Sequence, residues 1–236
     1  MQKVWAIIVA AGQGQRMEDP VRKQYHEVAG LPVITHTLRV FDTCAVIDEI
    51  VLCVPGQDID FCREELIKPA KLKKNIALAA GGDTRQESVF NGLQAIESNI
   101  GIIVIHDGVR PFITHAQITA CVEGAAIHGA CILGIPAFDT LKRVKANDSI
   151  IETVNREGIW MAQTPQAFQL DLIMRAHRHA RQKGHRATDD ASLLEHMGIE
   201  VKIIPGSRNN LKITDQDDLQ MARTLLKSGF KTSYQT

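Results

Sequence analysis

Short apolar runs that recur along nearly the whole chain constrain the fold more than any other feature of this sequence. The runs cover residues 4–9, 49–54, 75–79, 102–106, 130–135 and 199–204. Their apolar residues are mostly continuous and seldom alternate with polar ones, so the corresponding strands should be covered on both faces. The pattern therefore predicts a mostly parallel sheet.

The segments between these runs have the features of helices. Helices are expected to begin near Pro32, Thr84, Thr114, Leu170, Thr188 and Thr214. Thr84 and Thr114 each precede a Glu or Gln in the capping-box pattern, and Gly184 is placed to end the helix that begins near Leu170. No repeat, low-complexity tract or linker divides the chain. We therefore predict an α/β, Rossmann-like fold in a single domain over residues 1–236, with helices on both faces of the sheet.

The stretch 137–160 departs from this alternation of apolar runs and helical segments. It contains two segments in which polar and apolar residues alternate, joined by the turn-forming sequence KANDS at 145–149, and this is typical of a β-hairpin. A polar hairpin within an α/β chain usually projects from the body. It could be a loop without a role, or an arm that embraces a second subunit.

Composition excludes several classes of protein. Lys plus Arg and Asp plus Glu both number 27, and this balance argues against bulk binding of nucleic acid or of a charged membrane surface. No apolar run approaches the roughly 18 residues of a membrane span, and the first run is too short for a signal sequence, so we expect a soluble, cytoplasmic protein. The five cysteines include no C-x-x-C pair and are expected to be reduced core thiols.

The loop after the first apolar run contains Gly12 and Gly14, but it fits neither common nucleotide-binding fingerprint. Met17 stands where a dinucleotide-binding loop needs its third glycine, and no Walker A sequence occurs. What remains is a glycine-rich loop whose amides can approach phosphate oxygens, followed by the cations Arg16 and Lys23. These residues predict a triphosphate-binding site; the alternative is a solvated loop with surface cations.

Two other segments carry candidate site residues. Asp107 directly follows the run 102–106, at the edge where open α/β sheets bind ligands, and a single carboxylate there can hold Mg²⁺. The segment 79–89 joins a strand to a helix through paired glycines and offers hydroxyl and amide groups that can recognise a base or ribose. The alternatives are a turn or capping aspartate and a plain strand-to-helix turn.

A set of motifs occurs in the order and spacing of one enzyme family. The motifs are AAGQGQRM, KQY, GGDTRQESV, HDGVRP, DTLKR, NREGIWMAQTPQAF, TDDASLLE and NNLKITDQDDL, within residues 4–226. Together they resemble the 2-C-methyl-D-erythritol 4-phosphate cytidylyltransferases. The resemblance implies a nucleotidyltransferase fold that uses Mg²⁺ and converts CTP and methylerythritol 4-phosphate into the CDP-linked polyol and pyrophosphate, in the non-mevalonate route to isoprenoid precursors. A ribitol 5-phosphate cytidylyltransferase is the alternative, since that family shares the CTP loop.

The resemblance also implies roles for individual residues. Arg16 and Lys23 match the residues that stabilise the transition state, and Arg156 and Lys212 match those that position the methylerythritol phosphate. Substrate contacts are implied at Ala10, Ala11, Gly12, Gly82, Asp83, Ser88, Asp107, Thr140, Thr164 and Thr188, with Asp107 also the metal ligand. Residues 137–158 match an arm that forms a homodimer and lends Thr140 and Arg156 to the other subunit's pocket.

The chain departs from the family pattern at three positions. Arg22 stands where the family usually has a proline before Lys-Gln-Tyr, with Pro20 displaced upstream. Asn209 replaces an acidic residue of some relatives, and Val9 replaces a frequent proline. The first of these departures lies directly before Lys23.

Overall fold

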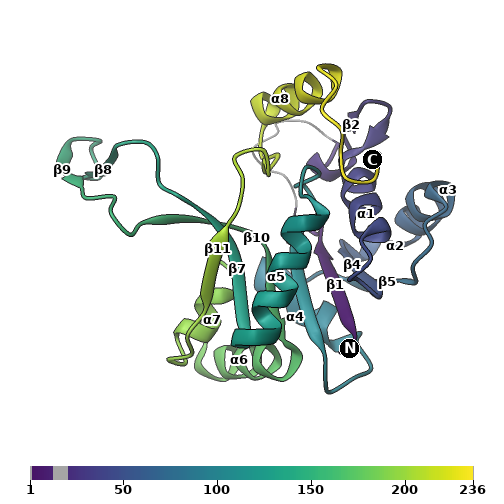
Figure 1. Cartoon of the computed structure of the whole chain (residues 1–236), viewed down its shortest axis with the longest axis horizontal. Coiled ribbons are helices and arrows are strands. Elements are labelled where there is room, and N and C mark those ends of the chain that lie inside the picture. Colours follow the sequence, from purple (N-terminus) through teal and green to yellow (C-terminus); the bar gives the residue numbers. More distant parts are fainter. Residues whose placement is uncertain (1, 13–20, 236) are drawn as a thin grey trace.

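The computed structural model of the chain describes residues 2–12 and 21–235. A seven-stranded sheet runs through the molecule (Figure 1). From one edge to the other its strands are β11 (Lys202–Pro205), β7 (Ala130–Pro136), β10 (Trp160–Gln169), β6 (Ile102–Asp107), β1 (Val4–Val9), β4 (Glu49–Val54) and β5 (Ile76–Ala80). Among the described strands of this sheet, β10 alone pairs with its neighbours in the antiparallel sense. The predicted α/β fold with a mostly parallel sheet is confirmed.

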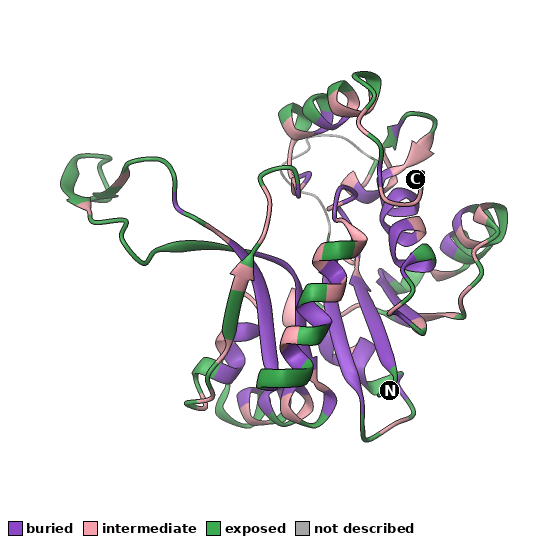
Figure 2. Ribbon diagram, in the orientation of Figure 1, coloured by how far each residue is buried: buried purple, intermediate pink, exposed green. Residues whose placement is uncertain are grey.

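Helices cover both faces of the sheet, as the continuous apolar runs require. One face packs against α1 (Val33–Thr43) and α5 (His115–His128). The other packs against α4 (Arg85–Gln94), α6 (Leu170–Lys183) and α7 (Ala191–Glu195). Successive side chains of a strand point to opposite faces, so Ala6 and Ile8 belong to the first cluster and Ile7 to the second. The middle strand β6 is buried throughout, and β1 and β4 are buried at all but one residue each (Figure 2).

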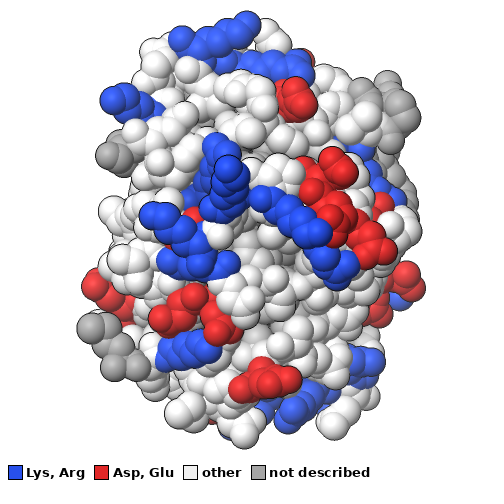
Figure 3. Space-filling model, turned by 90° about the vertical axis from the view of Figure 1, so that its right-hand side faces the viewer, with Lys and Arg blue, Asp and Glu red and all other residues white. Residues whose placement is uncertain are grey.

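Further elements lie outside the seven-stranded sheet and the helices that cover it. They are η2 (Lys23–Tyr25), β2 (Glu27–Val28), β3 (Leu31–Pro32), η3 (Gly56–Asp58), α2 (Ile59–Phe61), η4 (Cys62–Ile67), α3 (Lys68–Ala70) and α8 (Gln216–Lys227). A third core cluster joins α8 to β2 and to the loop after β6, through Leu219, Val28 and Phe112. Acidic and basic side chains lie side by side on the face shown in Figure 3.

The predicted hairpin is present and projects from the body of the molecule (Figure 1). Its strands β8 (Leu141–Val144) and β9 (Ile150–Val154) pair in the antiparallel sense and form a separate two-stranded sheet. Apolar side chains on it are exposed: Val144 is 50% accessible, Ile150 62% and Ile151 51%. An arm of this kind has no core of its own to bury these side chains.

Several local predictions hold. Both capping boxes form, with the Thr84 and Thr114 side chains accepting from the third helical amide, and Gly184 ends α6 in the left-handed conformation. All five cysteines are buried and free. No helix within the described part of the chain is both long and apolar enough to cross a membrane.

Other local predictions are wrong. Thr188 does not cap a helix, because α7 begins after Asp190. The helix expected near Pro32 does form, but the proline is its N-cap residue and lies in β3, so it precedes the first helical turn. The last strand begins at Lys202 and not at residue 199, because the amide of Ile199 instead donates to the Leu194 carbonyl and ends the α7 segment. Strand β10 was not predicted, because its sequence carries polar residues that only the neighbouring strands and loops can satisfy.

Candidate active site

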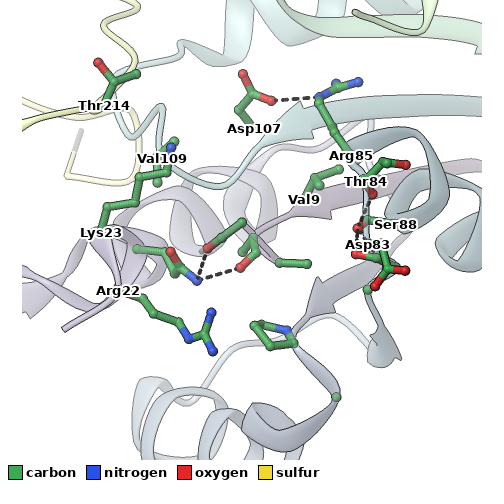
Figure 4. Close-up of a pocket in the computed structure, with 18 of the residues that line it drawn as sticks. Val9, Arg22, Lys23, Asp83, Thr84, Arg85, Ser88, Asp107, Val109 and Thr214 are labelled. Carbon is green, nitrogen blue, oxygen red and sulfur yellow. Dashed lines mark hydrogen bonds and ion pairs between the residues drawn. The ribbon is translucent and has the colours of Figure 1, made fainter. Parts of the chain in front are cut away.

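A cavity of about 890 Å³ opens at the carboxyl end of the parallel strands (Figure 4). Parallel pairing puts the ends of β1, β4, β5 and β6 at one edge of the sheet, where Val9 lies beside both Cys53 and Asp107. The loops that follow these strands therefore form the cavity walls. Of the predicted residues, the cavity is lined by Ala10, Ala11, Gly12, Lys23, Gly82, Asp83, Ser88, Asp107 and Lys212.

The glycines after β5 allow the walls of the cavity to approach each other closely. A Cβ atom at Gly81 would lie 2.2 Å from the Cβ of Ala11, and one at Gly82 would lie 2.4 Å from the Cβ of Glu87. Ser88, in the first turns of α4, accepts a hydrogen bond from the Gly82 amide at 3.1 Å. Bare backbone is needed here because two loops meet where a ligand could contact their amides.

Lys23 enters the cavity from the other side. Its neighbour Gln24 is 1% exposed and donates to the Ala10 carbonyl at 2.7 Å, which ties η2 to the loop after β1. In Figure 4 the Lys23 side chain extends toward Val109. The other predicted stabiliser, Arg16, lies outside the described residues.

Asp107 lies in the cavity wall beside three positively charged side chains. Its Oδ1 lies 3.3 Å from Nε of Arg85, and its Oδ2 lies 2.8 Å from Nζ of Lys212 and 3.3 Å from Nε of Arg110. Burial acts to raise the pKa of Asp107, but these positive charges outweigh it and hold the pKa well below its ordinary value. The carboxylate is therefore ionised at any physiological pH.

Arg85 and Arg110 are not among the predicted site residues, but the structure places both beside Asp107. Nη1 of Arg85 also pairs with Asp190 at 2.7 Å, and Nη1 of Arg110 donates to the Asn210 carbonyl at 2.7 Å. Both arginines occur within quoted motifs, GGDTRQESV and HDGVRP. The available signal was the position of each arginine shortly after an expected strand end, Arg85 at the start of a helix and Arg110 in a loop.

Thr164 lies beneath the cavity and supports the backbone of Asp107. Its Oγ1 accepts a hydrogen bond from the Asp107 amide at 3.1 Å, and its carbonyl accepts from Nδ2 of Asn210 at 2.8 Å. The threonine is only 5% exposed. Its observed contacts are with the protein, so contact with substrate stays a prediction.

Besides Thr164, three predicted residues in the described part of the chain do not line the cavity of their own chain. Thr140 and Arg156 lie in the projecting arm, where a guanidinium nitrogen of Arg156 donates to the Phe138 carbonyl. Thr188 is exposed on the loop before α7. The placement of Thr140 and Arg156 agrees with action on another subunit, and the roles of all three stay predictions.

Asp107 offers the donor chemistry that a hard cation requires. Mg²⁺ takes few ligands from protein and the remainder from phosphates and water. The two oxygens of a carboxylate offer about four acceptor positions, of which the neighbouring cations occupy three. No group of three or more His, Cys, Asp or Glu that could hold a metal occurs within residues 2–12 and 21–235. The site therefore fits a metal that arrives with phosphate ligands, and not a closed protein cage.

Known proteins resemble the chain over nearly its full length. The family model for 2-C-methyl-D-erythritol 4-phosphate cytidylyltransferase matches residues 4–228. An enzyme of that name from Pelotomaculum thermopropionicum is 43% identical over 228 residues, covering 97% of this chain and 96% of the relative. One from Syntrophus aciditrophicus is 45% identical over 225 residues, covering 95% and 96%.

A solved structure agrees with these sequence matches. The crystal structure of 4-diphosphocytidyl-2C-methyl-D-erythritol synthase from Anaerococcus prevotii superposes with a TM-score of 0.85 at 32% identity, covering 96% of each chain. The family resemblance inferred from the motifs is thereby confirmed. The chain belongs to the 2-C-methyl-D-erythritol 4-phosphate cytidylyltransferase family.

Proposed function

We propose that the protein binds its substrates in this cavity and transfers CMP from CTP to 2-C-methyl-D-erythritol 4-phosphate. The products are 4-diphosphocytidyl-2-C-methyl-D-erythritol and pyrophosphate. This is the family's reaction in the non-mevalonate route to isoprenoid precursors. The observation that carries the assignment is the ionised Asp107 between Arg85, Arg110 and Lys212, in a cavity whose other walls are glycine-rich loops. Such a site combines a carboxylate with several cations, which suits two phosphate-bearing substrates.

The acceptor phosphate is already an anion at neutral pH, so the reaction needs no general base. One of its oxygens attacks the α-phosphorus of CTP, the new P–O bond forms, and the bond to the β-phosphate oxygen breaks with release of pyrophosphate. The main difficulty is to bring two anions together in line. Positive side chains fixed around the reacting phosphorus offset the negative charge of both phosphates, and they do so without reorganising during the reaction.

The nucleotide is assigned to the walls formed by the loops after β1 and β5. Ala10, Ala11 and Gly12 offer backbone groups on one side, and Gly82, Asp83 and Ser88 offer backbone and side-chain groups on the other. Lys23 and Arg16 are assigned the role of stabilising the negative charge that develops on the triphosphate in the transition state. The cavity wall that carries Lys23 and the close approach of Gly81 to Ala11 support this assignment.

The acceptor phosphate is assigned to Lys212 of the same chain and to Arg156 and Thr140 from the arm of a second subunit. Lys212 lines the cavity and lies 2.8 Å from Asp107. Arg156 and Thr140 lie on the arm. A phosphate-binding site formed by residues of two chains would explain why Lys212 lines the cavity while Arg156 and Thr140 lie on the arm.

Asp107 is the residue that would hold Mg²⁺, together with phosphate oxygens of the substrates. When bound, the ion supplies further neutralisation of the phosphate charges. Arg85 and Arg110 keep the carboxylate ionised and oriented whether or not the ion is present.

The single domain is proposed to act as a cytoplasmic homodimer joined through residues 137–158. The exposed apolar side chains of the arm, Val144, Ile150 and Ile151, support this assembly. Side chains of this kind on a projecting hairpin are a surface that a second chain can cover.

Turnover of two sugar phosphates tests the proposed function. Purified protein with CTP and Mg²⁺ should release pyrophosphate with methylerythritol 4-phosphate, and much more slowly with ribitol 5-phosphate. A preference for ribitol 5-phosphate would instead assign the neighbouring cytidylyltransferase activity. Absence of pyrophosphate release with either acceptor would refute the proposal.

A further inference from the structure

Contacts outside the Asp107 cluster fix the short segment that carries Lys23. Lys23 begins η2, and Arg22 and Tyr25 on either side of it both contact the carboxylate of Asp58. Asp58 ends η3, the turn that follows β4. Two segments far apart in the sequence are therefore joined beside the cavity.

A single oxygen atom of Asp58 receives both contacts. The Tyr25 hydroxyl donates to Oδ2 at 2.9 Å, and Nε of Arg22 lies 3.2 Å from the same atom. The side chains of Arg22 and Asp58 are 25% and 18% exposed, so solvent screens the pair only in part. The Tyr25 ring also packs edge-on against Phe61, with 5.3 Å between the ring centroids.

The other side of η2 is held by the loop after β1. The buried amide of Gln24 donates to the Ala10 carbonyl at 2.7 Å. Lys23 thus lies between an anchor in the loop after β1 and an anchor on η3, and Pro55, Gly56 and Gln57 line the same cavity. A shift of η2 against either wall would break at least one of these contacts.

We propose that Asp58 is a positioning residue for Lys23: by holding Arg22 and Tyr25, it fixes the backbone from which Lys23 enters the cavity. The inference rests on the catalytic role proposed for Lys23 above. Asp58 itself is not among the residues that line the cavity, so its effect acts through the segment 22–25.

The backbone at Arg22 indicates what this contact replaces. Its φ is −64° and its ψ is 140°, and proline imposes a φ near −65°. The Arg22–Asp58 pair therefore restrains, through a side-chain contact, a conformation that a proline ring would impose covalently. This explains how the chain can carry arginine at a position where a proline is expected.

Kinetics of Asp58→Ala provide the first test, with Asp60→Ala as the matched control. Asp60 pairs only with Arg63 on the same exposed surface and has no contact with η2 among the described residues. Misplacing a catalytic group by about 1 Å costs up to about 100-fold, so kcat of Asp58→Ala should fall roughly 10- to 100-fold. KM for CTP should change by less than about threefold, because the contacts of Lys23 count mainly in the transition state. Asp60→Ala should behave as wild type.

Substitutions at Arg22 separate positioning from simple loss of a charge. Arg22→Pro keeps the observed φ without the ion pair, whereas Arg22→Ala loses both restraints. Arg22→Pro should therefore retain more of kcat than Arg22→Ala, and Asp58→Ala should cost less in the Arg22→Pro background than alone. If Asp58→Ala does not fold, Arg22→Ala, which removes a partly exposed pair, takes its place.

Amide hydrogen exchange gives a reading that does not depend on turnover. The Tyr25 amide donates to the Arg22 carbonyl at 2.9 Å, so its exchange should speed up in Asp58→Ala and stay unchanged in Asp60→Ala. Unchanged exchange in Asp58→Ala overturns the proposal, as does a kcat within about twofold of wild type. If the wild-type protein released no pyrophosphate, the proposed function would fail, and exchange would still decide whether Asp58 anchors this segment.

Discussion

Nη1 of Arg85 lies 2.7 Å from Oδ2 of Asp190, a carboxylate that is 1% exposed. Burial acts to raise the pKa of Asp190, but Arg85 and His177 outweigh it, so the pKa stays below its ordinary value and the group stays charged. Through its Nε the same guanidinium holds Asp107 in the cavity wall. A partly buried ion pair therefore connects the core under α7 with the site.

Arg85→Met should destabilise the protein strongly, because it removes the arginine that pairs with the buried carboxylate of Asp190. The free energy of unfolding should fall by about 3–5 kcal/mol, measured by urea denaturation. Arg63→Met, which removes the partner of the exposed Asp60, should change it by less than about 1 kcal/mol. Equal losses in the two variants would contradict the role given to Arg85.

Lys23→Ala should act on the chemical step. Removing one preorganised cation typically costs about 10²- to 10³-fold, so kcat should fall by that amount while KM for CTP changes far less. Steady-state pyrophosphate release measures both parameters, and Lys183→Ala, at the exposed end of α6, is the control. Near-normal turnover of Lys23→Ala would remove Lys23 from the mechanism.

Arg156→Ala and Lys212→Ala should chiefly impair use of the acceptor, because both are assigned to a phosphate that is present in the ground state and the transition state. KM for methylerythritol 4-phosphate should rise in each variant, and KM for CTP should rise less. Lys212 also contacts Asp107, so its loss should lower kcat more than the loss of Arg156. An unchanged acceptor KM in both variants would contradict the assignment.

Mixing two impaired variants, assayed with the acceptor well below its KM, tests whether Arg156 acts on the other subunit. A heterodimer of Lys23→Ala and Arg156→Ala chains contains one site with both intact residues if the arm works across the interface. Random reassociation would then restore about a quarter of wild-type activity, counted per site. No recovery, with heterodimers present, would place Arg156 in its own chain's site.

The arm should also determine the oligomeric state. Ile150→Glu puts a charge on a side chain that is 62% exposed in the single chain, so the fold should tolerate it while a covered dimer contact should not. Light scattering should report a dimer for wild type and a shift toward monomer for the variant. A monodisperse, fully active wild-type monomer would rule out the proposed assembly.

Acid should weaken the fold in part through His36. Burial lowers the pKa of this histidine below its ordinary value, and the ring contacts the Val28 carbonyl and the Tyr234 hydroxyl. In the unfolded chain His36 takes up a proton near pH 6.5, whereas in the folded chain it stays neutral at that pH. The free energy of unfolding should therefore fall as pH drops below about 6.5, by at most about 1.4 kcal/mol per pH unit from this group. His36→Gln should show a smaller fall between pH 7.5 and 5.5, on the order of this amount; equal falls would exclude His36.

Local sequence signals located most elements of the fold. The capping boxes at Thr84 and Thr114 act between residues three apart, so neighbours along the chain are enough to specify them. The continuous apolar runs likewise indicate strands buried on both faces. They fail for β10, whose Gln166 is buried and satisfied by Asp189 and by the amides of Asp190 and Ala191.

The site likewise has features that the local sequence indicates and contacts that only the tertiary structure shows. Glycine-rich turns, Asp107 at a strand end and the ordered motifs could be read from the sequence because each is a local pattern, and the motif order identified the family. The sequence could not show that Arg85 and Lys212 meet at Asp107, or that Asp58 holds Arg22 and Tyr25. Those contacts join residues far apart in the chain, and only the parallel sheet, which gathers the ends of separate strands at one edge, brings them within a few ångströms.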